Sequence, residues 1–129
     1  MINRMEGHVM PVSTQARPVD LVHLSRYTGG DPALNAEILQ LFSGQAAELM
    51  KKLQDVLEAR DPKGWKEITH SLKGAARGIG AFALADAAAS AEPALPASDN
   101  SAAIRALQDL KVQAEAVQLF IGAYLGPKI

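Results

Sequence analysis

Residues 61–80 read DPKGWKEITHSLKGAARGIG, and this stretch decides how the rest of the chain is interpreted. It opens with Asp61-Pro62, an N-cap followed by a proline at the first helical position, and it closes with the glycines Gly78 and Gly80. At about 100° per residue, the apolar side chains form one continuous stripe. The members of this stripe are Trp65, Ile68, Leu72, Ala75, Ala76 and Ile79. The stretch therefore predicts an amphipathic helix with one buried face.

The opposite face of this helix is polar and carries a histidine at its centre. Within roughly 60° of His70 lie four cations and one acid, namely Lys63, Lys66, Glu67, Lys73 and Arg77. Gly74 follows one turn after His70 in mid-helix, where a glycine costs about 1 kcal/mol relative to alanine. Packing on a solvent face does not require a missing side chain, so Gly74 suggests that a partner approaches His70 closely. The plainer interpretation is a solvated helix face that happens to contain a histidine.

Two further helices are predicted on the N-terminal side of this stretch. Asp20 is a good N-cap for a short helix that ends at the glycine pair 29–30. Asp31-Pro32 repeats the strong start signal, and the apolar stripe after it runs to about residue 60. The apolar residues of this stripe are Leu34, Ile38, Leu41, Phe42, Leu49, Leu53, Val56 and Leu57.

Two more helices are predicted on the C-terminal side. An alanine-rich helix runs from Phe82 to Glu92, and Pro93 and Pro96 prevent its continuation. The last helix starts near residues 98–101, and its apolar residues are spaced 4-3-4-3-4-3: Ala103, Leu107, Leu110, Ala114, Val117, Ile121 and Tyr124. This heptad spacing suits the roughly 20° crossings of an antiparallel bundle. We therefore predict an all-α fold, an antiparallel four-helix bundle with a short additional N-terminal helix.

Length and composition exclude several classes of protein. The 129 residues fit one domain, with a flexible tail over residues 1–17 and the bundle over residues 18–129. The absence of cysteine excludes a disulfide scaffold, a thiolate metal site and a cysteine nucleophile. A formal net charge of −1 argues against nucleic acid as a partner. No apolar run approaches the roughly 18 residues of a membrane span, and the N-terminus has no secretory pattern, so we expect a cytoplasmic protein.

The pentapeptide His70-Ser71-Leu72-Lys73-Gly74 resembles the H-x-L-K-G signature of histidine-containing phosphotransfer (HPt) domains. The similarity extends over nearly the whole predicted fold. Further matches in order and spacing are Gly80-Ala81, Leu84 and, upstream, residues 20–24, residues 29–31 and Phe42.

The resemblance implies a specific activity. HPt domains are four-helix bundles that carry a phosphoryl group on the Nε2 atom of an exposed histidine. They accept it from the aspartate of one response-regulator receiver domain and pass it to another, without kinase activity of their own. The resemblance implies that His70 is the phospho-acceptor, that Lys73 stabilises the phosphoryl oxygens and that Gly74 leaves room for the partner. It implies receiver domains and a hybrid sensor histidine kinase as partners, with Mg²⁺ held by the receiver and not by this chain.

One residue departs from the family pattern. Glu92 stands where many HPt domains have a glutamine on the helix that follows the histidine. A carboxylate cannot donate a hydrogen bond to phosphate. We therefore expect Glu92 either to accept a hydrogen bond from the Nδ1–H group of His70 or to pair with Lys73.

The other polar residues divide into partner contacts and residues without a role. Lys63, Lys66 and Arg77 are expected to face an acidic pocket on the receiver. His8 lies in the tail and His23 is predicted on the exposed side of the first helix. Their spacing relative to each other and to the candidate histidine does not suit a metal site. A phosphate-binding P-loop sequence is absent, so there is no sign of an autonomous kinase. We expect no cofactor or metal on this chain.

A second function, from another class, remains open. A non-catalytic helical adaptor, in effect a degenerate phosphotransfer domain, would bind receiver or kinase domains and use His70 only as a contact. Such an adaptor does not need the combined set of His70, Lys73 and Gly74. That set therefore favours the phosphoryl carrier over the adaptor.

Overall fold

The computed structural model describes residues 17–94 and 100–126. About 84% of these residues are helical, and none of them forms a strand. The predicted tail, apart from Arg17, lies outside the described residues, and so does Pro96 in the connection before the last helix.

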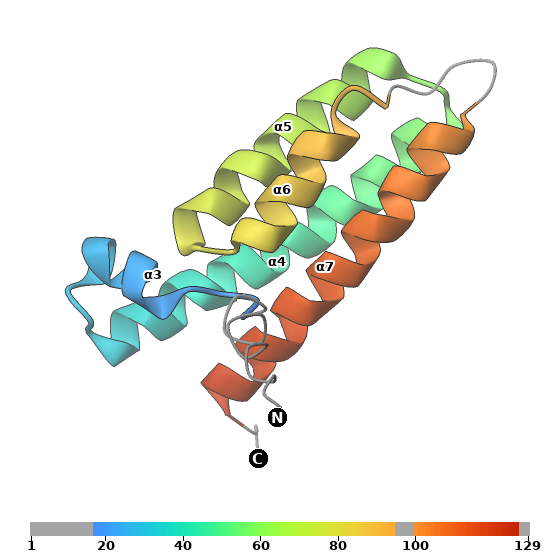
Figure 1. Ribbon diagram of the computed structural model, residues 1–129. Helices are drawn as coiled ribbons and strands as arrows, with labels where there is room; N and C mark the ends of the chain where they lie inside the picture. Colours follow the sequence, from blue (N-terminus) through green and yellow to red (C-terminus); the bar gives the residue numbers. More distant parts are fainter. Residues whose placement is uncertain (1–16, 95–99, 127–129) are drawn as a thin grey trace, which may run out of the picture.

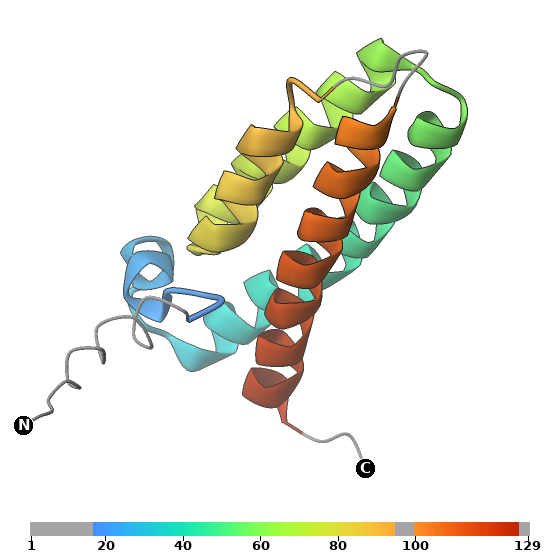
Figure 2. The ribbon, with the colours of Figure 1, turned by 45° about the vertical axis from the view of Figure 1, so that its right-hand side comes forward.

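The described chain forms a four-helix bundle with one short helix at its end. The helices are α3 (Leu21–Thr28), α4 (Pro32–Glu58), α5 (Pro62–Ile79), α6 (Phe82–Ala91) and α7 (Ser101–Leu125). Successive helices from α4 to α7 run up and down and pack as neighbours, and α7 closes the ring against α4 (Figures 1 and 2). Helix α3 packs against α4 and α5 at one end of the bundle. The predicted all-α fold is confirmed.

The helix starts follow from local capping. Asp20, Asp31 and Asp61 each adopt the N-cap position, and the carboxylates of the first two each accept hydrogen bonds from two backbone N–H groups in the first turn, whereas that of Asp61 accepts one, from Gly64. These bonds satisfy donors that have no partner within the helix. Pro32 and Pro62 occupy the first helical positions, where a missing N–H costs nothing. The start signals identified in the sequence are therefore confirmed.

A glycine holds α3 against the end of α5. Gly80 ends α5 with a φ of +83°, in the left-handed region that favours glycine. The backbone N–H of Asp20 donates to the Gly80 carbonyl at 2.9 Å. A Cβ atom at Gly80 would lie 2.7 Å from the Asp20 carbonyl oxygen. Both the backbone angle and the close approach of α3 therefore require glycine at this position.

The residues predicted to form the apolar seam of α7 are almost all buried, whereas the buried stripe of α4 contains fewer residues than predicted. In the seam, six of the seven residues are buried and Tyr124 is half-buried. In α4, Leu41 is 70% exposed although it was expected in the apolar stripe. Leu41 lies two residues, about 200°, beyond the fully buried Leu39, and therefore points away from the core. Leu34 in α4 and Tyr27 in α3 are also exposed.

Candidate functional site

The candidate histidine lies on the outward face of α5, as its place in the sequence predicted. His70 is exposed, and it makes no hydrogen bond or ion pair with the residues that the structure describes. It lines a shallow open pocket of about 470 Å³ together with Lys66, Glu67, Ser71 and Glu92. The imidazole therefore has no hydrogen bond or ion pair to lose when a partner or a new covalent group arrives.

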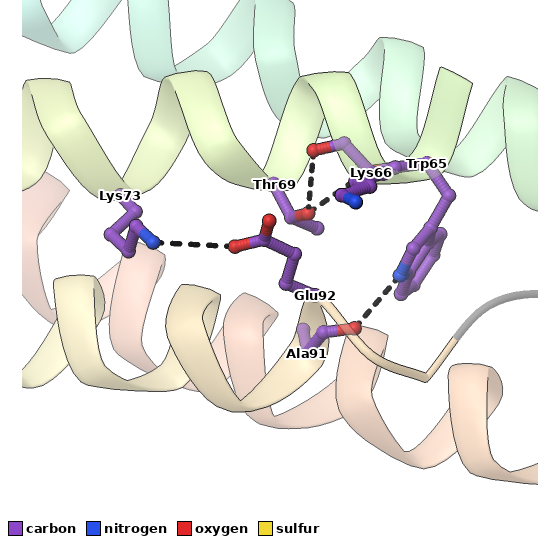
Figure 3. A network of polar contacts seen from close by, with 6 residues as sticks. All are labelled: Trp65, Lys66, Thr69, Lys73, Ala91 and Glu92. Atoms are coloured by element: carbon purple, nitrogen blue, oxygen red, sulfur yellow. Dashed lines mark hydrogen bonds and ion pairs between the residues drawn. The ribbon is translucent and has the colours of Figure 1, made fainter. Parts of the chain in front are cut away.

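The buried face of α5 is rotated towards α6 relative to the predicted stripe. Thr69, directly before the histidine, is completely buried, whereas Ile68 and Ala75 are only half-buried. The Thr69 hydroxyl donates to the carbonyl of Trp65 at 2.9 Å, and it lies 3.1 Å from the carbonyl of Lys66 (Figure 3). A hydroxyl that is hydrogen-bonded within its own helix can be buried at little cost. The apolar pattern misses Thr69 because it counts threonine as polar.

A tryptophan ties α5 to the last turn of α6. The indole N–H of the fully buried Trp65 donates to the Ala91 carbonyl at 2.8 Å (Figure 3). Ala91 directly precedes Glu92, whose backbone N–H donates to the Ala88 carbonyl at 3.1 Å. The peptide group that joins Ala91 to Glu92 is therefore fixed beside α5. The sequence analysis took Trp65 as a core residue, and this second contact was not foreseen.

Glu92 pairs with the candidate lysine. The Lys73 ammonium lies 3.3 Å from Glu92 Oε1, and the two side chains are only 22% and 21% exposed (Figure 3). Of the two roles considered for Glu92, the structure shows the pairing with Lys73. The Lys73 ammonium is therefore paired and partly buried, unlike the exposed cations of the same helix. Its position, about 60° from His70 on the α6 side of the helix, brings it to the junction of the two helices.

Gly74 and three other cations occupy the open side of α5. A Cβ atom at Gly74 would meet no heavy atom within 4 Å, and α5 continues without a break past this residue. The fold therefore does not require a glycine at this position. Lys63, Lys66 and Arg77 are all exposed. Only Lys66 lines the pocket with His70, whereas the other two lie in the first and last turns of the helix.

The remaining histidines lie away from this site. His23 is half-buried, not on the exposed side of α3 as predicted, because its ring packs edge-on against Phe82 at 5.0 Å and Tyr27 at 5.7 Å. His8 lies outside the described residues. Among residues 17–94 and 100–126, no three His, Asp or Glu side chains are grouped to hold a metal ion. In the same part of the chain, no helix has the length and apolar character to cross a membrane.

Comparison with known protein families supplies the context for this arrangement. The model of the Hpt domain family matches residues 37–120, which is more than half of the chain. The matched region contains His70, Lys73, Gly74 and Glu92. Searches of curated proteins and of solved structures found no match. The family match and the all-helical bundle together show that this chain belongs to the Hpt domain family, the phosphotransfer-type domains of two-component systems.

Proposed function

We propose that this chain is the histidine phosphotransfer protein of a two-component phosphorelay. It accepts a phosphoryl group on His70 from the aspartate of one receiver domain and passes it to another. The observation that carries the proposal is the exposed, unpaired imidazole of His70 in a domain of this family. Membership in the family implies interaction with receiver or kinase components, and we include a hybrid sensor histidine kinase among them. We further propose that the chain acts in the cytoplasm as a monomer.

The transfer step requires little chemistry from this chain. The lone pair on Nε2 of the neutral imidazole attacks the phosphorus of the receiver's aspartyl phosphate, and an N–P bond forms. The P–O bond to the aspartate breaks, and its electron pair stays on the aspartate as a carboxylate. The proton on Nδ1 passes to water. Mg²⁺ on the receiver would bind the phosphoryl oxygens, so the role of this chain is positioning and charge compensation.

Neighbouring residues on α5 would assist this step. A phosphoryl group adds a charge of roughly −2, and the resemblance to the family makes the Lys73 ammonium a candidate to offset it. Gly74 leaves the side of His70 open, because no side chain stands at that position. Lys63, Lys66 and Arg77 would attract the acidic pocket that surrounds a receiver aspartate.

The decisive experiment is phosphorylation by a phosphorylated receiver domain. The chain should acquire phosphate that is acid-labile and base-stable, as expected for phosphohistidine. His70→Gln should abolish this label and leave helicity and the melting temperature almost unchanged, because the imidazole is exposed and makes no hydrogen bond or ion pair with the described residues. His23→Gln is the matched control and should still accept phosphate. Label that persists in His70→Gln would disprove the assignment.

The adaptor remains as a second candidate, and one observation favours it. The ammonium of Lys73 is already paired with the carboxylate of Glu92, so Lys73 is not free to bind a phosphoryl group on His70. An adaptor would bind receivers and never become phosphorylated by any of them. Transfer measured against the full set of receivers in the host distinguishes the two functions.

A further inference from the structure

A carboxylate stands beside the imidazole that the proposed function phosphorylates. Glu92 lines the same pocket as His70, and so does Glu67. Two cations, Lys66 and Lys73, accompany these two acids, so the four formal charges around the imidazole sum to zero. The site is therefore not the strongly positive surface that the cations of α5 suggest when that helix is considered alone.

The position of this carboxylate is built into the fold. Trp65 holds the carbonyl of the preceding residue through a buried hydrogen bond of 2.8 Å. The Glu92 side chain is 21% exposed and lies against Lys73, not in open solvent. Asp86, another acid on α6, is exposed and lines the groove towards α7. Of these two acids on one helix segment, only Glu92 is held at the candidate site.

Phosphorylation would change the balance of charge at this position. A phosphoryl dianion on His70 would compete with the Glu92 carboxylate for the ammonium of Lys73. The phosphoryl dianion would also be repelled by the negative charge of Glu92. Because the Glu92 side chain is mostly shielded from solvent, this repulsion is screened less than it would be at the surface. Both effects raise the free energy of the phosphorylated form, whereas the unphosphorylated form keeps an intact ion pair.

We propose that Glu92 sets the transfer potential of the phosphohistidine. By holding Lys73 and adding negative charge, Glu92 makes the phosphorylated form less stable and favours passage of the phosphoryl group to a receiver. Trp65 acts as a positioning residue, because it fixes the end of α6 from which Glu92 projects. This inference rests on the proposed function and adds a regulation of the same site.

The test is Glu92→Gln, which removes the charge and keeps the size of the side chain. The equilibrium constant for transfer from one phosphorylated receiver to the chain should shift towards phosphohistidine by roughly three- to tenfold. The half-life of the phosphohistidine should lengthen, and transfer onward to a second receiver should slow. Asp86→Asn is the matched control, because it changes the net charge equally on the same helix. It should leave all three quantities unchanged.

The possible outcomes separate this inference from the proposed function. An unchanged equilibrium in Glu92→Gln would overturn the inference, and so would a shift towards the receiver, which would mean that Glu92 orients Lys73 for the phosphoryl group. In both cases the wild-type chain would still accept phosphate, and the proposed function would stand. If the wild-type chain accepts no phosphate from any receiver, the proposed function fails and this inference fails with it.

Discussion

The two faces of α5 differ in what determines their residues. On the buried face, Trp65, Thr69 and Leu72 are completely buried, and the first two make hydrogen bonds that hold the helix and its neighbour in place. On the open face, His70 makes no hydrogen bond or ion pair with the described residues, and a Cβ atom at Gly74 would meet no heavy atom within 4 Å. The residues of the buried face are explained by packing, whereas those of the open face are not.

A residue of a small helical bundle is a candidate functional residue when no packing contact explains its presence. Thr69 and His70 are consecutive, but only Thr69 has a structural reason to be present. A glycine in mid-helix reduces stability, and at Gly74 no packing contact compensates for that loss. Under the proposed function, the phosphoryl transfer and the close approach of a receiver would account for these two open-face residues. The comparison predicts that changes on the open face alter transfer and that changes on the buried face alter stability.

The largest effect is expected for Gly74→Gln. A Cβ atom at this exposed position would meet no heavy atom within 4 Å, and the rest of the glutamine side chain can extend into solvent beside His70, so the variant should fold normally. It should transfer phosphoryl about a hundredfold more slowly, because a misplacement of the reacting groups by about 1 Å can cost that much. Single-turnover transfer from a phosphorylated receiver measures the rate. Transfer at the wild-type rate would leave Gly74 without a functional explanation.

On the buried face, Trp65→Phe should weaken the fold. The variant keeps an aromatic ring but loses the indole donor, so the Ala91 carbonyl keeps only the hydrogen bond from the Ala94 N–H, and the smaller ring leaves a cavity in the core. The lost hydrogen bond and the cavity together should lower the free energy of unfolding in urea by about 1–3 kcal/mol. The transfer equilibrium should also move towards phosphohistidine, because Glu92 is held less firmly. His70→Gln is the control from the open face and should stay within about 0.5 kcal/mol of wild type. Equal stability losses in the two variants would contradict the prediction that only the buried face of α5 contributes to stability.

A smaller effect with the opposite sign is expected for Gly74→Ala. Alanine removes the cost of a mid-helix glycine and meets nothing in the fold, so the free energy of unfolding should rise by about 0.5–1 kcal/mol. Gly44→Ala, at an equally open position in α4, should give a similar rise. Gly80→Ala should instead destabilise the protein, because of its positive φ and the nearby Asp20 carbonyl. Thermal melting checks all three, and a loss of stability in Gly74→Ala would show a constraint on the open face.

The smallest effects are expected at the two ends of the open face. Lys63→Ala and Arg77→Ala should each weaken association with a receiver by about 0.2–1 kcal/mol, since both side chains are exposed. The differences should disappear as salt is added, because exposed charges are screened. Titration calorimetry at several salt concentrations measures them. Association that does not depend on salt would point to an apolar docking surface instead.

Much of the fold and part of the site could be predicted from the sequence. The caps at Asp20, Asp31 and Asp61, the terminating Gly80 and the exposure of His70 all depend on residues within about four positions of each other. Backbone hydrogen bonding and helical periodicity act over this range, so a single sequence contains the necessary information. The seam of α7 was predictable for the same reason.

Only the tertiary structure decided the contacts between helices. Lys73 and Glu92 are 19 residues apart, and Trp65 and Ala91 are 26 apart. Whether such pairs meet depends on the rotation of α5 and α6 about their axes, and the packing of both helices together sets that rotation. Which helices form, and that His70 faces solvent, could therefore be predicted from the residues of each helix. The pairing of Glu92 with Lys73 depends on how α5 and α6 pack together, because neither helix alone contains that information.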